Sequence, residues 1–273
     1  MTATAASILL NLTPPVRYVL RIADTCLIHA QRLAEWSGHG PVLEEDIALS
    51  NMALDLIGQA RGLLTHAARL EGQCRQGDFS EDQLAFLRDE RDYLNLTLAE
   101  QPLRRSSAHA SGGDFADTVL RNFVLATWLK AIWSRLATSV DADLAAIAGK
   151  ALKEARYHQQ HAGDWVMRLG DGTEESARRM QAAVERIWPY TNEMFMRDAV
   201  DEAAEETLLG PARNTLQAVW LAEVSVVLAE SQLTMPMATP FVSTGTLGRH
   251  SEHLGFMLAE MQSLQRQHPG GRW

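Results

Sequence analysis

The chain has 273 residues, of which 46% are hydrophobic and 22% charged, so it can bury a large core as one domain. Its formal net charge of −9 argues against nucleic-acid and anionic-membrane partners, because both need a concentrated basic surface. No window reaches the roughly 20 apolar residues that a membrane-spanning helix needs, and residues 2–11 do not resemble a signal peptide. Two cysteines, Cys26 and Cys74, are too few for a disulfide framework. We therefore expect a cytoplasmic globular protein.

Apolar residues recur at intervals of three and four, the period of a helix, and no segment alternates with the period of a strand. Thr13 before Pro14 and Pro15 marks the first helix start, and Asp114 is expected to cap a later helix. The predicted helices cover residues 14–34, 44–72, 80–101, 115–138, 143–169, 173–195 with a kink at Pro189, 212–233 and 250–267. We expect one all-α domain over residues 1–273, with a ferritin-like four-helix core, flanking helices, a flexible extension at 1–13 and a loop at 104–113.

The run Glu154-Ala155-Arg156-Tyr157-His158 bears on metal binding. Ferritin-like di-iron proteins take a Glu from each of two helices and a Glu-x-x-His pair from each of two others. Here the residue three places after Glu154 is Tyr157. His158, one place further, lies about 100° further round the helix and does not occupy the same direction. The run therefore keeps the carboxylate and lacks the expected imidazole.

The other ligand positions follow from the two predicted hairpins, since residues equidistant from a turn lie at the same height in an antiparallel helix pair. Asp24 and Asp55 are equidistant from the turn near residues 39–40, and they are expected to face each other. Glu154 is level with Ala126 across the turn near residue 140. The six matched positions are Asp24, Asp55, Gly58, Ala126, Glu154 and Tyr157. Three of the four carboxylate positions are filled and neither imidazole position is, so we interpret the site as vestigial, without catalytic residues or metal.

Two alternatives remain open at this stage. Glu154, His158 and His161 share one helix face at spacings of four and three, which would restore part of a ligand set. The chain would then be an independent di-iron or di-manganese oxidase or oxygenase using Asp24, Asp55, Glu154 and His158. If no metal binds, the buried carboxylates need partners, and the candidate cations are Lys130, Arg61 and Arg156. A third hypothesis, a helical protein that binds or stores a small molecule, has no supporting feature beyond the scaffold.

The last predicted helix carries an apolar stripe before a tryptophan. Its residues are Leu254, Met257, Leu258 and Met261, and Trp273 follows at the end of the sequence. Such a helix either docks on its own core or contributes to a subunit interface, and we take these five residues as interface candidates.

Six separated runs resemble one family, the C subunits of bacterial phenylacetyl-CoA epoxidases. They are residues 31–36, 54–61, 88–91, 153–158, 252–255 and 258–262, with the sequences QRLAEW, LDLIGQAR, RDER, KEARYH, EHLG and LAEMQ. The resemblance covers residues 16–273 and implies a ferritin-like subunit of a multicomponent monooxygenase, which forms the ring-1,2-epoxide of phenylacetyl-CoA in phenylacetate breakdown.

The resemblance also implies how the work of such a complex is divided. The A subunit carries the di-iron centre and binds phenylacetyl-CoA, and a reductase with flavin and iron–sulfur groups supplies electrons from NADPH. The C subunit is a degenerate copy that supports the A subunit and holds no cofactor. We therefore expect this chain to act in a hetero-oligomer, with the A subunit as its direct partner.

Overall fold

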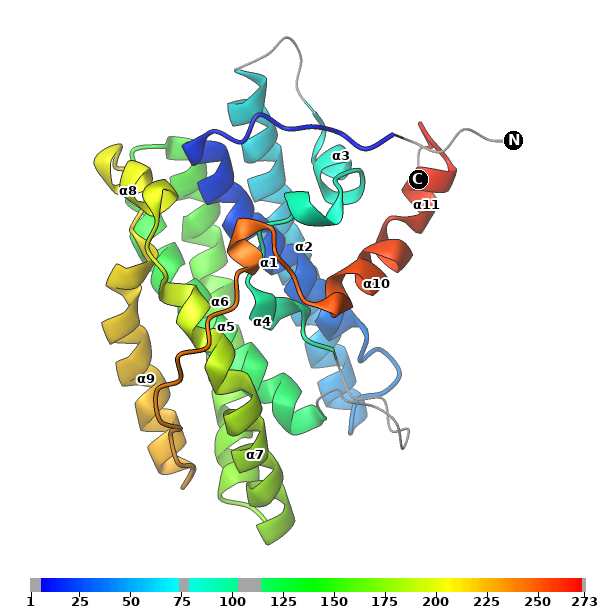
Figure 1. Ribbon diagram of the computed structural model, residues 1–273. Helices are drawn as coiled ribbons and strands as arrows, with labels where there is room; N and C mark the ends of the chain where they lie inside the picture. Colours follow the sequence, from blue (N-terminus) through cyan, green and yellow to red (C-terminus); the bar gives the residue numbers. More distant parts are fainter. Residues whose placement is uncertain (1–5, 74–78, 103–113, 272–273) are drawn as a thin grey trace.

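The computed structural model of the chain describes residues 6–73, 79–102 and 114–271. Within these residues the regular secondary structure consists of α-helices and short 3₁₀ helices, with no strand (Figure 1). Thr244 and Arg249 add one isolated β-bridge. The all-α prediction is confirmed. Among the described helices, none combines the length and the apolar character needed to cross a membrane. The predicted loop at 104–113, Cys74 and Trp273 lie outside the described residues.

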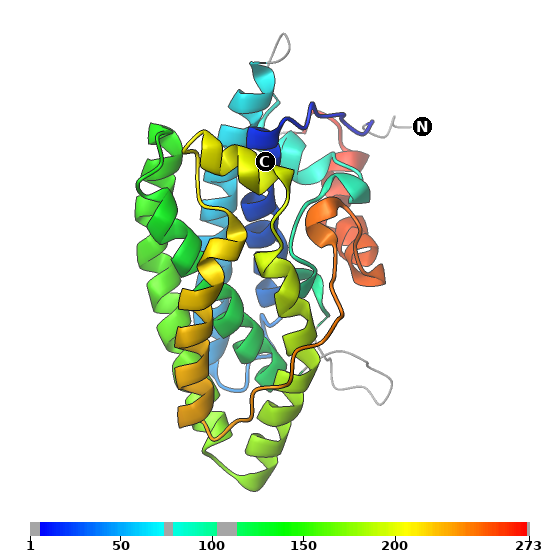
Figure 2. The ribbon, with the colours of Figure 1, turned by 60° about the vertical axis from the view of Figure 1, so that its left-hand side comes forward.

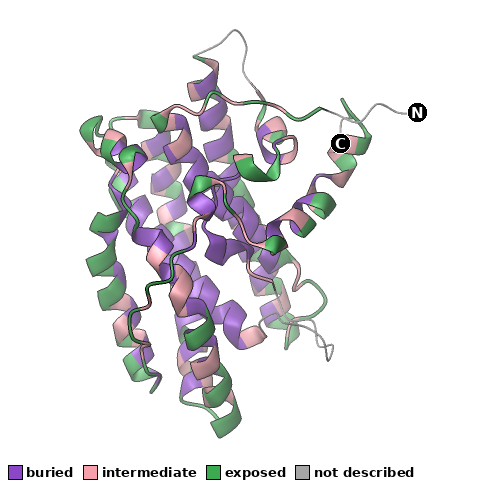
Figure 3. Cartoon of the chain, viewed as in Figure 1, coloured by how far each residue is buried: buried purple, intermediate pink, exposed green. Residues whose placement is uncertain are grey.

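Four long helices form the ferritin-like core: α1 (Pro14–Ala34), α2 (Leu43–Gly72), α5 (Phe115–Leu136) and α6 (Ala142–Gly170). α1 packs along α2, α5 packs along α6, and α2 also contacts α6. Helices α7 (Glu174–Ile187) and α9 (Gln217–Glu230) flank α5 and α6 (Figure 2). Trp128 and Trp133 are among the largest buried side chains, and Figure 3 shows that the buried residues concentrate along the core helices.

Local signals place several helix ends. α1 begins directly after Thr13, although the Thr13 side chain makes no capping hydrogen bond, and Pro14 and Pro15 supply the fixed backbone of the first turn. Asp114 caps α5 as predicted, since its carboxylate accepts a 2.9 Å hydrogen bond from the Ala116 amide. Gly38 follows α1 with φ at +78°, a conformation that favours glycine.

The prediction of one helix over 80–101 is wrong. The segment contains α3 (Glu81–Phe86), the 3₁₀ turn η1 (Glu90–Asp92) and α4 (Thr97–Glu100). The chain leaves the helical path because Arg88 turns inward and is fully buried. Tertiary contacts of this kind override helix propensity.

The region after α6 also differs from the prediction. α7 ends at Ile187, and the stretch with Pro189 continues as the 3₁₀ helix η2 (Trp188–Phe195), because proline removes a helical hydrogen bond. A short helix, α8 (Ala199–Glu206), was not predicted. The predicted helix at 212–233 is present as η3 (Arg213–Leu216) followed by α9.

Two buried carboxylates fix the segment that leads to the last helices. Glu193 accepts hydrogen bonds from the Ser243 hydroxyl at 2.7 Å and from the Thr246 amide at 2.7 Å, within or beside η4 (Gly245–Leu247). Glu100 accepts a 2.6 Å bond from the Ser251 amide. The segment is therefore anchored to the core before α10 begins.

The last predicted helix is divided into α10 (Glu252–Met261) and α11 (Ser263–Gln267). Gln262 lies at the break, and its side-chain amide donates to the Arg88 carbonyl at 2.9 Å and to the Tyr93 hydroxyl at 2.9 Å. At the other end of the chain, the Ile8 amide donates to the Leu87 carbonyl at 3.0 Å, so part of the predicted N-terminal extension contacts this same region.

Candidate functional site in the four-helix core

Asp24 is fully buried on α1 and is held by an arginine from outside the four-helix core. The Arg88 guanidinium donates to both carboxylate oxygens, with Nη1 to Oδ2 at 3.0 Å, and the Leu94 amide donates to Oδ2 at 2.8 Å. Burial opposes the charge on Arg88, but Asp24 reverses this effect and raises the pKa of Arg88. Asp24 is thus a partner in a buried ion pair, and its oxygens are already occupied.

The structure does not bring Asp24 and Asp55 together. Asp55 lies at the junction of α2 and α6, where His158 Nε2 is 3.1 Å from its Oδ2, and its side chain is 41% exposed. Two residues at equal distance from a turn lie at the same height along a helix pair. The direction of each side chain depends on the rotation of its helix about its axis, and here the two carboxylates point in different directions.

The other matched positions also diverge. Ala126 is buried in the core, whereas Gly58 is exposed on α2. Tyr157 is 55% exposed, and the neighbouring His158 is the residue that turns inward. The predicted rotation of α6 about its own axis was therefore wrong by one residue. The six positions do not form one ligand sphere.

Glu154, His158 and His161 share one side of α6, as their spacing predicted. Each has its own partner on α2. Gln59 donates to Glu154 at 3.0 Å, His158 lies 3.1 Å from Asp55, and His161 Nε2 lies 2.9 Å from Glu45. We call this row of three cross-helix contacts the α2–α6 seam. Its side chains are engaged in pairs that join the two helices.

A further buried histidine lies on α1. His29 Nε2 is 3.2 Å from the Asn122 side-chain oxygen on α5. Burial lowers the pKa of His29 to about 3, and the charge of nearby Arg121 adds to this effect. Burial also lowers the pKa of His158, although Asp55 opposes the shift. Both imidazoles are therefore neutral at pH 7.

Sequence reasoning missed Arg88, Gln59 and Asn122. Arg88 falls inside one of the runs that carry the family resemblance, but its position between α3 and η1 gives no spacing signal that would pair it with α1. Gln59 follows Gly58 directly, and only the true rotation of α2 shows that Gln59 faces inward. None of the three proposed cations pairs with Asp24, Asp55 or Glu154 in the described residues: Lys130 pairs with Glu223, Arg61 pairs with Glu81, and Arg156 lines a groove beside α9.

These residues do not fit a di-iron centre. Within the described parts of the chain, no group of three His, Cys, Asp or Glu side chains is arranged to hold a metal ion. Asp24 is bound to a guanidinium, and the two histidines of the α2–α6 seam each contact a single carboxylate. The arrangement joins helices and leaves no convergent set of free donors.

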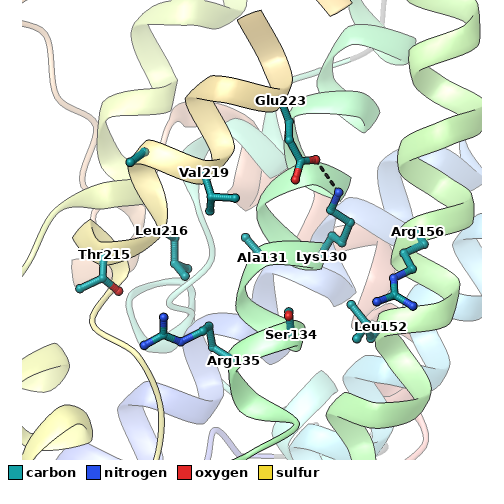
Figure 4. Close-up of a pocket in the computed structure, with 11 residues that line it drawn as sticks. Lys130, Ala131, Ser134, Arg135, Leu152, Arg156, Thr215, Leu216, Val219 and Glu223 are labelled. Atoms are coloured by element: carbon teal, nitrogen blue, oxygen red, sulfur yellow. Dashed lines mark hydrogen bonds and ion pairs between the residues drawn. The ribbon is translucent and has the colours of Figure 1, made fainter. Parts of the chain in front are cut away.

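A groove of about 600 Å³ lies between α5, α6 and the η3–α9 segment. Figure 4 shows Lys130 reaching Glu223 across it, with Arg135 and Arg156 on opposite sides. Neither arginine side chain has a hydrogen bond or ion pair within the described residues. Leu152, Leu216 and Val219 supply apolar surface, so the groove combines a basic border with an apolar floor.

Comparisons with known proteins agree with the resemblance seen in the sequence. A family model described as "Phenylacetic acid catabolic protein" matches residues 1–273. The chain is 47% identical over 256 residues to the C subunit of the 1,2-phenylacetyl-CoA epoxidase of Escherichia coli (strain K12), and the match covers 94% of this chain and 98% of that protein. The predicted kinship is confirmed. The chain belongs to the phenylacetic acid catabolic protein family.

Proposed function

We propose that this chain is a structural, metal-free subunit of a phenylacetyl-CoA epoxidase and that it supports a di-iron catalytic A subunit. The E. coli relative is by name the C subunit of such an epoxidase, and the match spans nearly the whole of both chains. The observation that carries the proposal is the Asp24–Arg88 pair, because it occupies the buried carboxylate on α1 with a protein cation.

Metal binding at Asp24 would require this pair to separate. A buried guanidinium that loses its carboxylate costs several kcal/mol, and within the described residues the carboxylate that pairs with Arg88 is that of Asp24. The histidines of the α2–α6 seam would likewise have to leave Asp55 and Glu45. The residues therefore favour a scaffold over a metal centre.

In the proposed complex, iron and the phenylacetyl-CoA site belong to the A subunit. Electrons come from NADPH through a reductase with flavin and iron–sulfur groups. This chain supplies no cofactor, and the complex acts in the cytoplasm. Its contribution is the surface and stability that keep the A subunit active.

One observation favours the alternative of an independent di-metal oxidase: Glu154, His158 and His161 lie on one face of α6. Metal analysis separates the two. The chain should be produced alone in iron-rich medium, purified and assayed for iron and manganese, and it should also be produced with the A subunit. The proposal predicts far less than one metal ion per chain alone and copurification with the A subunit. Stoichiometric metal in the lone chain would support the oxidase instead.

A further inference from the structure

The groove between α5, α6 and the η3–α9 segment is basic, although the chain as a whole is acidic. The chain has 34 acidic residues against 25 lysines and arginines. The charged side chains among the described groove residues are Lys130, Arg135, Arg156 and Glu223, an excess of two positive charges. Positive charge gathered in a concave site attracts anions. The groove therefore favours a negatively charged ligand.

Glu223 does not neutralise the two arginines of the groove, because it is engaged elsewhere. Its carboxylate pairs with Lys130 and accepts a hydrogen bond from the Gln159 side chain. Arg135 and Arg156 lie on opposite sides of the groove, as Figure 4 shows, and neither has a hydrogen bond or ion pair in the described part of the chain. Both guanidinium groups therefore keep their donors for an anion.

The helix pattern of α5 and α6 separates the two guanidinium groups. Arg135 follows the groove residue Ala131 by four positions, and Arg156 follows Leu152 by four, so each arginine shares a helix face with an apolar groove residue. The two helices are antiparallel, so Arg135 lies towards their connecting turn and Arg156 away from it. Arg156 is about twelve residues further from the turn than Arg135, which is about 18 Å along the axis. A ligand that meets both arginines is elongated.

The remaining lining of the groove is mainly apolar. Its apolar residues are Ala131, Leu152, Leu216, Ala218 and Val219. The volume of about 600 Å³ lies within the range of small-molecule sites, which combine an apolar lining with a few polar anchors. The ligand therefore needs an apolar body as well as its charges.

The wall of the groove that α9 forms is fixed to the core. The buried Trp220 donates a 3.0 Å hydrogen bond to the Val124 carbonyl on α5. Further along α9, Glu223 is held by Lys130 and Gln159. A wall held in this way needs little ordering when a ligand binds, which favours affinity.

The apolar stripe of α10, taken from the sequence as an interface candidate, forms no comparable site. Leu254, Met257 and Leu258 are buried by the chain itself, and Met261 is half-buried. α10 therefore uses its stripe as a strap on its own core. In the groove, by contrast, Val219 remains 49% exposed beside an open volume.

We propose that the groove binds an elongated organic dianion, with a carboxylate or phosphate group at each end and an apolar middle. Arg135 and Arg156 each bind one end, since a guanidinium group donates paired hydrogen bonds to either kind of anion. The apolar middle packs against Leu152, Leu216 and Val219. The inference goes beyond the proposed function, because a supporting subunit needs no ligand of its own.

The test uses the purified chain and decanedioate, a ten-carbon chain with a carboxylate at each end. Titration calorimetry measures its dissociation constant for the wild type, Arg135→Gln, Arg156→Gln and Lys153→Gln. Lys153 is the matched control, because it is an exposed cation of α6 outside the groove lining. We expect one site per chain. Each arginine variant should weaken binding about tenfold or more, because charge-assisted hydrogen bonds are lost, and Lys153→Gln should change it less than about twofold.

Related ligands test the two ends and the middle. Decanoate, with one carboxylate, should bind about tenfold more weakly than decanedioate, because one arginine is left without a partner. Inorganic phosphate, which has no apolar part, should not displace decanedioate at equal concentration. The bisphosphate ester of the same ten-carbon diol should also bind, and the tighter of the two dianions identifies the end group that the groove prefers.

Four results would overturn the inference. Neither dianion binds the lone chain at a saturable site, or decanoate binds as tightly as decanedioate, or phosphate displaces decanedioate. Equal weakening by Lys153→Gln and the arginine variants would show attraction by net charge alone. The titration is then repeated on the complex with the A subunit. Complete loss of binding there would show that the partner covers the groove, which removes the ligand site from the working protein and leaves the proposed function standing.

Discussion

Asp24 and Arg88 form an ion pair in which neither side chain reaches solvent. Arg88 also donates to the carbonyls of Leu84 and Asp92, and its guanidinium lies 4.3 Å from the centre of the Tyr93 ring. A pair satisfied in this way connects α1 to the segment between α3 and α4. Removing either partner would destabilise the fold, since the other partner would remain as an uncompensated buried charge.

Single and double substitutions at this pair should therefore not be additive. We expect Asp24→Leu and Arg88→Met each to lower the free energy of unfolding by about 3–5 kcal/mol. The double variant should cost less than the sum of the two by about 2 kcal/mol or more, because it leaves no unpaired charge. Urea denaturation at pH 7 measures all three. Additive losses would show that the two side chains stabilise the fold independently.

His29 gives a second prediction, on pH. Its pKa falls from about 6.5 in the unfolded chain to about 3 in the fold, so the stability that it supports is fully present above pH 6.5 and is lost as the pH falls. Between pH 6 and 4 the loss from this group approaches roughly 1.4 kcal/mol per pH unit. His29→Gln should flatten the dependence of the unfolding free energy on pH over this window. An unchanged slope would assign the acid sensitivity to other groups, such as His158, whose pKa is also lowered.

Among the helices, the core was predictable from the sequence where local chemistry sets the structure. The Pro14-Pro15 pair, the Asp114 cap and apolar periodicity place α1, α2, α5 and α6 to within about two residues of their observed ends. The segment 80–101 was not predictable in the same way, because Arg88 bonds to a residue 64 positions earlier. The prediction that the six matched positions face one another was wrong for a related reason. Numbering predicts height along a hairpin, but a one-residue error in rotation exchanges exposed Tyr157 for buried His158.

Two glycines test the environment described for α2. Gly58→Ala should raise the unfolding free energy of the isolated chain by about 0.5–1 kcal/mol, because the added methyl group meets nothing and the helix gains propensity. Gly163→Ala on α6 is the matched control. Its Cβ would lie 3.3 Å from the Phe123 ring, so the propensity gain should be reduced or reversed. Thermal melting of both variants checks this, and a clear loss of stability in Gly58→Ala would contradict the open environment of that position.

For the whole molecule, the helices keep the ferritin-like arrangement while the side chains at its centre serve as cross-links. Asp24 is bound to Arg88, and the α2–α6 seam pairs its histidines and Glu154 with residues of α2. Exposed apolar side chains lie on the outside of several elements, among them Leu54 on α2, Val226 on α9 and Phe256 on α10. A molecule built in this way is suited to supporting a partner, as the proposed function requires.

The decisive experiment measures turnover of the assembled epoxidase with Glu154→Gln in this subunit alone. Glutamine keeps an oxygen that can accept the hydrogen bond from Gln59, so the seam and the assembly should persist. We predict that the rate of epoxidation stays within about threefold of the rate of the wild-type complex. A residue that only supports the fold should change transition-state stabilisation by less than about 1 kcal/mol. A fall of several orders of magnitude, with assembly intact by size-exclusion chromatography, would place catalysis in this chain and contradict the structural role.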